Sequence, residues 1–351
     1  MEKLLQKYKD DYWPSLKINK RELLDSKAKN NLQNAFFSSP FISDEFKKKL
    51  EKIVKSKIIK YTFTIKLNQG NVNFHFVTNQ STNFVNKIAK YFFFVIFLRL
   101  NLNSQKRLLF LENMYINLLP VNISKTFNNN MNIHDINSAS TIVYPDFYGG
   151  PIFIWRADEI EKVLIHETLH SVHYDTNIIN QNLITVLKNM EEKCCKNGMN
   201  INEAYTELCA SFIFNLFKSN SKKLLKKHLL KELDHSLHNC ARLLEENNIS
   251  KDIENLFLNN YKQEASAFSY IILKTGLLWL MLDKCKSKIK AHTDKIRCLE
   301  EFIEIGFWGN IGISYQDIIV SLMQNKDFIK KIVKRYSKKK RGRPEKLILV
   351  I

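Results

Sequence analysis

The chain has 351 residues, of which 45% are hydrophobic and 25% charged, a balance typical of a globular protein with a buried core. Only 9 glycines and 6 prolines are present, which excludes a collagen-like or linker-like chain. Lysine and arginine outnumber aspartate and glutamate by 54 to 35, a formal net charge of +19 at pH 7. Residues 327–346 hold ten basic and two acidic side chains, so a polyanionic partner is expected to meet this end of the chain.

The cysteine pattern and the apolar runs favour a reduced intracellular protein without a membrane span. Six cysteines are present: Cys194, Cys195, Cys209, Cys240, Cys285 and Cys298. They form no C-x-x-C pair, which disfavours a zinc ribbon and a regular disulfide framework. The start MEKLLQKYKDDYW carries charges where a signal peptide needs an apolar core. Residues 91–98 and 268–282 are too short or too interrupted for the roughly 20 residues of a spanning helix.

Residues 1–105 predict an N-terminal region of helices and one β-hairpin. Ser43 precedes the helical stretch FKKKLEKIVKS, whose acidic first turn and basic end suit the helix dipole. The segments YTFTIKLN and VNFHFVT alternate β-forming residues on either side of Gln69 and Gly70, which predicts a hairpin. A long apolar helix is expected from Ser81 to about Leu100.

Residues 106–336 predict a mixed core whose C-terminal half, from about Ile179, is mostly helical. Gly149, Gly150 and Pro151 break the chain before the short β-like run IFIW. Asp158 is expected to cap a helix within DEIEKVLIHETLHSVHYD. The fold class is therefore α+β, with a small mixed β-sheet beside this helix. Residues 337–351 form a separate basic tail.

The expected helix carries the motif H-E-x-x-H as His166, Glu167 and His170. Two histidines four residues apart lie on one helical face, as two ligands of a tetrahedral zinc require. The glutamate between them can reach a water in the open coordination position. The motif therefore predicts a zinc site with a built-in base.

A third ligand is expected from the segment NEAYTE, which begins 32 residues after His170. Glu203 and Glu207 share one helical face, so one carboxylate can bind the metal while the other accepts a hydrogen bond from a ligand histidine. The alternative is a solvated helix face. It is disfavoured because apolar side chains follow: Leu208, Cys209, Ala210, Phe212 and Ile213.

HETLH followed by NEAYTE resembles the gluzincin group of zinc metallopeptidases, in which N-E-x-x-[ST]-[DE] lies downstream of H-E-x-x-H. The stretch 137–217, about a quarter of the chain, is similar to uncharacterised zinc peptidases of nucleocytoplasmic large DNA viruses. The gap between the two motifs is longer than in thermolysin-like enzymes. The resemblance implies a zincin-like fold and a Zn²⁺ cofactor. It also implies these roles: His166, His170 and Glu203 as ligands, Glu167 as catalytic base, and Glu207 as hydrogen-bond partner of a ligand.

These features predict a zinc-dependent peptidase that acts on a protein or peptide substrate. Zinc would lower the pKa of its water and polarise the scissile carbonyl, while Glu167 takes the proton and delivers it to the leaving amine. The choice between endopeptidase and exopeptidase stays open. The expected location is the cytoplasm, or a viral factory for a viral protein, with the nucleus as alternative.

Three features near the motif each have two interpretations. The run IFIW is either an edge strand that pairs with an extended peptide or an ordinary core strand. His173, seven residues after His166, is expected to line the site or to be buried rather than to bind the metal. Arg156 either binds a substrate carboxylate or pairs with Glu161 or Asp158.

The tail SKKKRGRPEK carries a second functional motif. Its core, Arg341, Gly342, Arg343 and Pro344, resembles an AT-hook, which enters the narrow minor groove of A·T-rich DNA while lysines meet phosphates. The alternatives are a solvated charged tail and a nuclear-import-like patch. A second hypothesis therefore describes a nucleic-acid-associated protein whose zincin core is structural or inactive.

Overall fold

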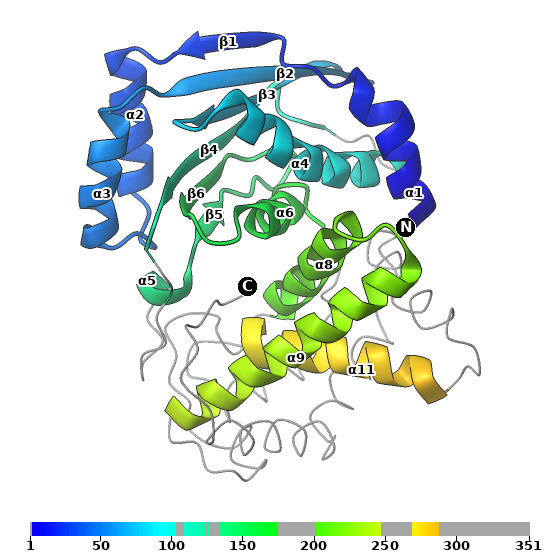
Figure 1. Ribbon diagram of the computed structural model, residues 1–351. Helices are drawn as coiled ribbons and strands as arrows, with labels where there is room; N and C mark the ends of the chain where they lie inside the picture. Colours follow the sequence, from blue (N-terminus) through cyan, green and yellow to red (C-terminus); the bar gives the residue numbers. More distant parts are fainter. Residues whose placement is uncertain are drawn as a thin grey trace. The chain divides into compact units, whose positions relative to one another are not determined.

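The chain divides into two compact units in the computed structural model (Figure 1). The first contains residues 1–124 and 137–174, and the second contains residues 125–136 and 175–351. The structure describes residues 2–102, 109–123, 125, 133–174, 201–246 and 269–287. The two units are described separately.

A six-stranded mixed β-sheet with the order β1-β2-β3-β4-β6-β5 is the centre of the first unit. Its strands are β1 (Lys20–Leu23), β2 (Ile59–Leu67), β3 (Gly70–Thr78), β4 (Asn113–Val121), β5 (Ala139–Thr141) and β6 (Ile152–Arg156). Strands β3, β4 and β6 run parallel, while the β1–β2, β2–β3 and β5–β6 pairs are antiparallel. Strands from before and after residue 105 therefore share one sheet, and β5 is an edge strand.

The helices of the first unit surround this sheet. They are α1 (Glu2–Lys7), α2 (Ser26–Phe37), α3 (Asp44–Val54), α4 (Thr82–Leu102) and α6 (Ile160–Ser171), with a π-helical segment at Tyr8–Tyr12 and a 3₁₀ turn at Trp13–Ser15. The predicted start of α3 is confirmed, because the Ser43 hydroxyl accepts a hydrogen bond from the amide of Phe46. Helices α2 and α3 contribute to a core that also includes Trp155 of β6.

The predicted hairpin and apolar helix are both confirmed. Strands β2 and β3 pair along their whole lengths, and Gly70 supplies the positive φ of +128° at the turn. Helix α4 packs aromatic rings on the sheet, with the Phe93 ring centroid 5.1 Å from Phe63 and 5.3 Å from Phe74. This edge-on aromatic packing buries one face of the sheet.

The second unit is helical in the part that the structure describes. Its elements are α5 (Ile133–Ile136), α8 (Ile201–Phe217), α9 (Lys222–Glu246), a π-helical segment (Ser269–Leu273) and α11 (Lys274–Ser287). A buried ion pair links two of these helices, with Lys274 Nζ 2.7 Å from Glu232 Oε1. Cys240 is buried with a free thiol, and burial raises the pKa of that thiol to about 12.

The observed architecture confirms the α+β class, the mixed sheet and a helical C-terminal part. The zincin assignment stays a prediction. None of the helices within the described ranges combines the length and apolar character needed to cross a membrane. The tail, residues 337–351, lies outside the described residues, and so does the expected AT-hook.

Candidate metal centre

Helix α6 carries the H-E-x-x-H motif and begins two residues later than Asp158. The expectation that Asp158 caps this helix is wrong, because the N-cap position is Glu159. Glu159 has a left-handed backbone, with φ 54° and ψ 35°, and makes no side-chain cap hydrogen bond. The short connection from β6 turns sharply into the helix at this residue, so backbone geometry decides where α6 begins.

Two backbone hydrogen bonds from His173 and Tyr174 cap the C-terminal end of α6. The amide of His173 donates to the His170 carbonyl at 2.9 Å, and the amide of Tyr174 donates to the Leu169 carbonyl at 2.9 Å. With φ of 52° at His173, this is the Schellman arrangement, in which the left-handed position is usually glycine. The helix therefore ends before His173, and this residue does not continue the metal-binding face.

His173 is buried at this helix end, as one of the two expectations for it stated. Its ring lies 4.9 Å from the ring of Tyr148 in an edge-on contact. The Tyr148 hydroxyl in turn accepts a hydrogen bond from Arg99 at 2.8 Å. His173 thus belongs to an aromatic and cationic cluster with Tyr148 and Arg99.

His166 and His170 bring their Nε2 atoms to 3.0 Å of one another. His166 is buried and His170 is half-buried, and their rings meet edge-on with centroids 4.7 Å apart. Two nitrogens at about 2.0–2.1 Å from a tetrahedral zinc would be about 3.4 Å apart, close to the observed separation. The separation of the two nitrogens is therefore compatible with a shared cation.

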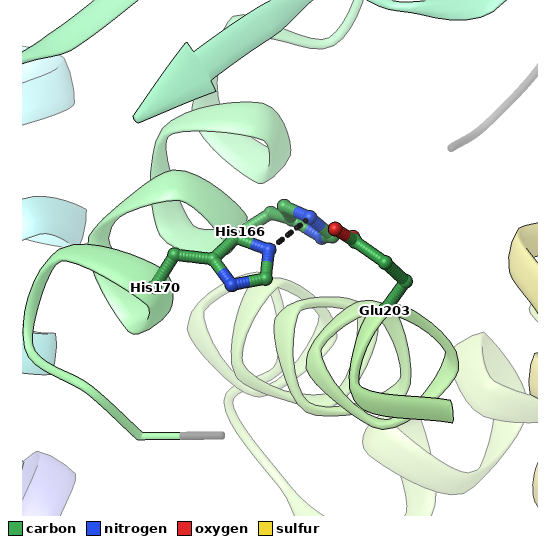
Figure 2. A group of neighbouring side chains, drawn as sticks. All are labelled: His166, His170 and Glu203. Atoms are coloured by element: carbon green, nitrogen blue, oxygen red, sulfur yellow. Dashed lines mark hydrogen bonds between the residues drawn. The ribbon is translucent and has the colours of Figure 1, made fainter. Parts of the chain in front are cut away.

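Glu203 offers the third ligand atom of the group. One nitrogen of each histidine and one carboxylate oxygen of Glu203 all lie within 4.8 Å of one another. Figure 2 shows the Glu203 side chain, from the first turn of α8, reaching toward the His166 ring. These three side chains form a group that could hold a metal ion, and they are the ligands that the gluzincin resemblance implies.

Glu167 is buried next to the two histidines and is bound by the edge strand. The Thr141 hydroxyl lies 2.6 Å from Oε2 of Glu167 and 3.2 Å from its carbonyl oxygen. Thr141 is the last residue of β5, so the edge of the sheet touches the motif helix at the residue expected to act as base. The sequence reasoning missed Thr141, and only the strand pairing next to α6 reveals it.

The remaining predictions near the motif have mixed outcomes. The run IFIW is not an edge strand, because β6 lies between β4 and β5, so the core-strand interpretation is correct.

Arg156 is 1% exposed and donates to the carbonyls of Asn137 and Ile123. It is therefore buried away from any substrate carboxylate. Glu161 pairs with Lys87 at 2.6 Å. Glu207 is buried in α8, and its role toward a ligand histidine stays a prediction.

Comparisons with known proteins show a distant viral relative. The chain is 25% identical over 183 residues to uncharacterized protein R210 of Acanthamoeba polyphaga mimivirus. The similarity covers 43% of this chain and 46% of that protein, so the chain spans about half the length of its relative. No family model and no solved structure matches the chain. The relative agrees with the expected link to large DNA viruses, while the peptidase family stays a prediction.

Proposed function

We propose that this protein is a zinc-dependent peptidase that uses Glu167 as its general base. The observation that carries the proposal is the convergence of His166, His170 and Glu203, whose ligand atoms lie within 4.8 Å. The distant mimivirus relative supports a viral protein, which would act in the host cytoplasm or at a viral factory. The proposal includes the zincin architecture, with a motif helix beside a mixed sheet.

The donor chemistry of the group favours zinc over magnesium and calcium. Two imidazole nitrogens and one carboxylate oxygen are a usual ligand set of catalytic zinc, which keeps its fourth position open for water. Magnesium and calcium prefer oxygen ligands throughout. When bound, zinc lowers the pKa of water and polarises a carbonyl group.

Glu167 is positioned for proton transfer by its own helix and by Thr141. It follows His166 directly in α6 and is buried, so its carboxylate lies among protein groups rather than in bulk solvent. The Thr141 hydroxyl donates to Oε2 at 2.6 Å and so orients the Glu167 carboxylate, which would accept a proton from an attacking water. The same group can later donate that proton to the leaving amine.

The edge position of β5 supports an extended polypeptide as substrate. One side of β5 pairs with β6, and among the described residues no strand pairs with the opposite side. An extended peptide can add to such an edge through main-chain hydrogen bonds. Since Thr141 of β5 touches Glu167, a peptide on this edge would pass beside the candidate base.

The test compares Glu167→Gln with the wild-type chain, both loaded with zinc. We expect Glu167→Gln to keep one zinc per chain and to lose at least about 100-fold in cleavage of a peptide library followed by mass spectrometry. Glu161→Gln is the matched control, because Glu161 lies in the same helix and pairs with Lys87. Its turnover should stay near wild type.

Two outcomes would count against the proposal. Wild-type turnover in Glu167→Gln would remove this carboxylate from the mechanism. A zinc-free, inactive wild-type protein that binds A·T-rich duplex DNA would favour the alternative, a nucleic-acid-associated protein with the tail motif Arg341–Pro344. Removal of zinc with a chelator and its re-addition separates metal dependence from misfolding.

A further inference from the structure

We propose that residues 142–147, here called the apolar hairpin, form the recognition surface for large apolar side chains of the polypeptide substrate. This inference rests on the proposed peptidase function and adds a substrate preference to it. The hairpin connects β5 to β6, directly after Thr141. Its sequence is IVYPDF, in which Asp146 is the single charged residue.

The apolar hairpin exposes four large hydrophobic side chains within six residues. The exposed fractions are 48% for Ile142, 45% for Val143, 38% for Tyr144 and 43% for Phe147. A single exposed apolar residue is ordinary, whereas several exposed in one short segment point to a binding surface. The local sequence does not need these residues for the turn, which Pro145 and Asp146 can make by themselves.

The apolar hairpin has a defined shape. Tyr144 and Phe147 face each other across the turn in an antiparallel bridge, and the Ile142 amide donates to the Pro151 carbonyl at 3.1 Å. Gly150 lets the two ends of the connection lie this close together, because a Cβ at this position would lie 1.7 Å from the Ile142 carbonyl oxygen. The backbone that carries the four apolar side chains therefore has a defined conformation.

Both ends of the connection are attached to the motif helix. At the start, Thr141 bonds Glu167 at 2.6 Å. At the end, the Gly149 amide donates to the Ser171 carbonyl at 3.0 Å, and the Ser171 hydroxyl donates to the Gly150 carbonyl at 3.1 Å. The apolar patch therefore keeps a fixed position relative to the candidate base and to the helix that carries it.

This attachment argues for the substrate as the occupant of the patch. A peptide lying along β5 with a carbonyl near Glu167 must continue past Ile142 and Val143, which follow Thr141 without a break. Its neighbouring side chains would then meet the apolar hairpin. Since only Asp146 is charged there, the surface selects by apolar burial and not by ion pairing.

The experiment measures peptide binding apart from catalysis, in the zinc-loaded full chain carrying Glu167→Gln. The probes are fluorescein-labelled ten-residue extended peptides of equal charge, with either Phe and Leu or Ser and Thr at the central positions. We expect the apolar peptide to bind at least about 10-fold more tightly by fluorescence anisotropy. Adding Ile142→Ser and Phe147→Ser should remove this preference.

The matched control adds Leu23→Ser and Leu230→Ser instead, which removes two side chains that are 63% and 46% exposed elsewhere. This control should keep the preference. Equal binding of both peptides, or equal loss in hairpin and control variants, would overturn the inference. A concentration-dependent dimer that only the hairpin variant abolishes would also overturn it, by assigning the patch to a second copy.

The two proposals fail in different ways. If peptides bind with an apolar preference but the wild-type chain cleaves none of them, the peptidase function fails while the apolar surface stands. If the wild-type chain cleaves peptides without regard to apolar residues, the peptidase function stands and the recognition role of the apolar hairpin fails.

Discussion

The Thr141 hydroxyl lies 2.6 Å from Oε2 of Glu167 and 3.2 Å from the carbonyl oxygen of the same residue. One side chain of the edge strand therefore reaches both the backbone and the carboxylate of the motif helix. This relationship ties the sheet edge, where a peptide would lie, to the group expected to activate water. It makes Thr141 a positioning residue in the proposed mechanism.

Thr141→Val should reduce kcat while leaving KM and the zinc content close to wild type. The methyl group keeps the shape of the side chain but cannot donate to Oε2, so the carboxylate loses its fixed orientation. Loss of such an outer partner typically costs about 10–100-fold. Thr141→Ser keeps the hydroxyl and should restore most of kcat. An equal loss in both variants would show that the methyl packing, rather than the hydrogen bond, matters.

His166→Ala and His170→Ala should each lose the metal. With one imidazole removed, two ligands remain, and the zinc affinity of the group should fall below what survives dialysis. Metal content by mass spectrometry of the dialysed protein is the measurement. His173→Asn is the control, because asparagine tolerates the left-handed backbone and His173 lies outside the group. One zinc per chain in both alanine variants would refute the ligand assignment.

Glu203→Ala and Glu207→Ala should differ in zinc affinity. Glu203 belongs to the group within 4.8 Å, so its loss removes a direct ligand. Glu207 is expected to hold a ligand histidine, and its loss should cost about 10–100-fold. Competition with a chromophoric chelator gives both dissociation constants. The reverse order of affinities would make Glu207 the ligand.

Gly150→Ala should destabilise the protein by about 1–3 kcal/mol, the usual range for forcing an extra group into a packed region. The added Cβ would lie 1.7 Å from the Ile142 carbonyl oxygen, a backbone atom that cannot turn aside as a side chain would. The denaturant midpoint should fall, and the apolar hairpin should open. An unchanged midpoint would show that the hairpin relaxes without cost.

Lys274→Met should destabilise the second unit by about 3–5 kcal/mol, because it leaves a buried carboxylate without its cation. Lys274 and Glu232 are 3% and 7% exposed, and Lys274 also donates to the Ser236 hydroxyl at 2.9 Å. The double variant Lys274→Met with Glu232→Gln removes both charges and should recover much of this loss in urea unfolding. If the double variant loses as much free energy of unfolding as the two single variants lose in total, Lys274 and Glu232 do not stabilise one another.

The sequence by itself determined the parts of the structure that depend on local patterns. Ser43 marks the start of α3, since capping involves residues only three apart. The hairpin turn at Gly70 follows from the alternating β-forming residues on either side of it. The helix α4 follows from one long apolar stretch. The shared face of His166 and His170 follows from helical spacing alone, because residues four apart lie one turn apart.

Tertiary structure alone decided how these parts meet. Whether β6 or β5 is the edge strand depends on which strands pair, and the residues of a strand do not reveal which strands lie next to it. For the same reason Thr141, 26 residues before Glu167, could not be found from spacing. Arg156 proved to be buried because the loops that surround it come from distant segments. Helix α6 ends at Ser171 because His173 adopts a left-handed backbone, a conformation that a local pattern without glycine does not predict.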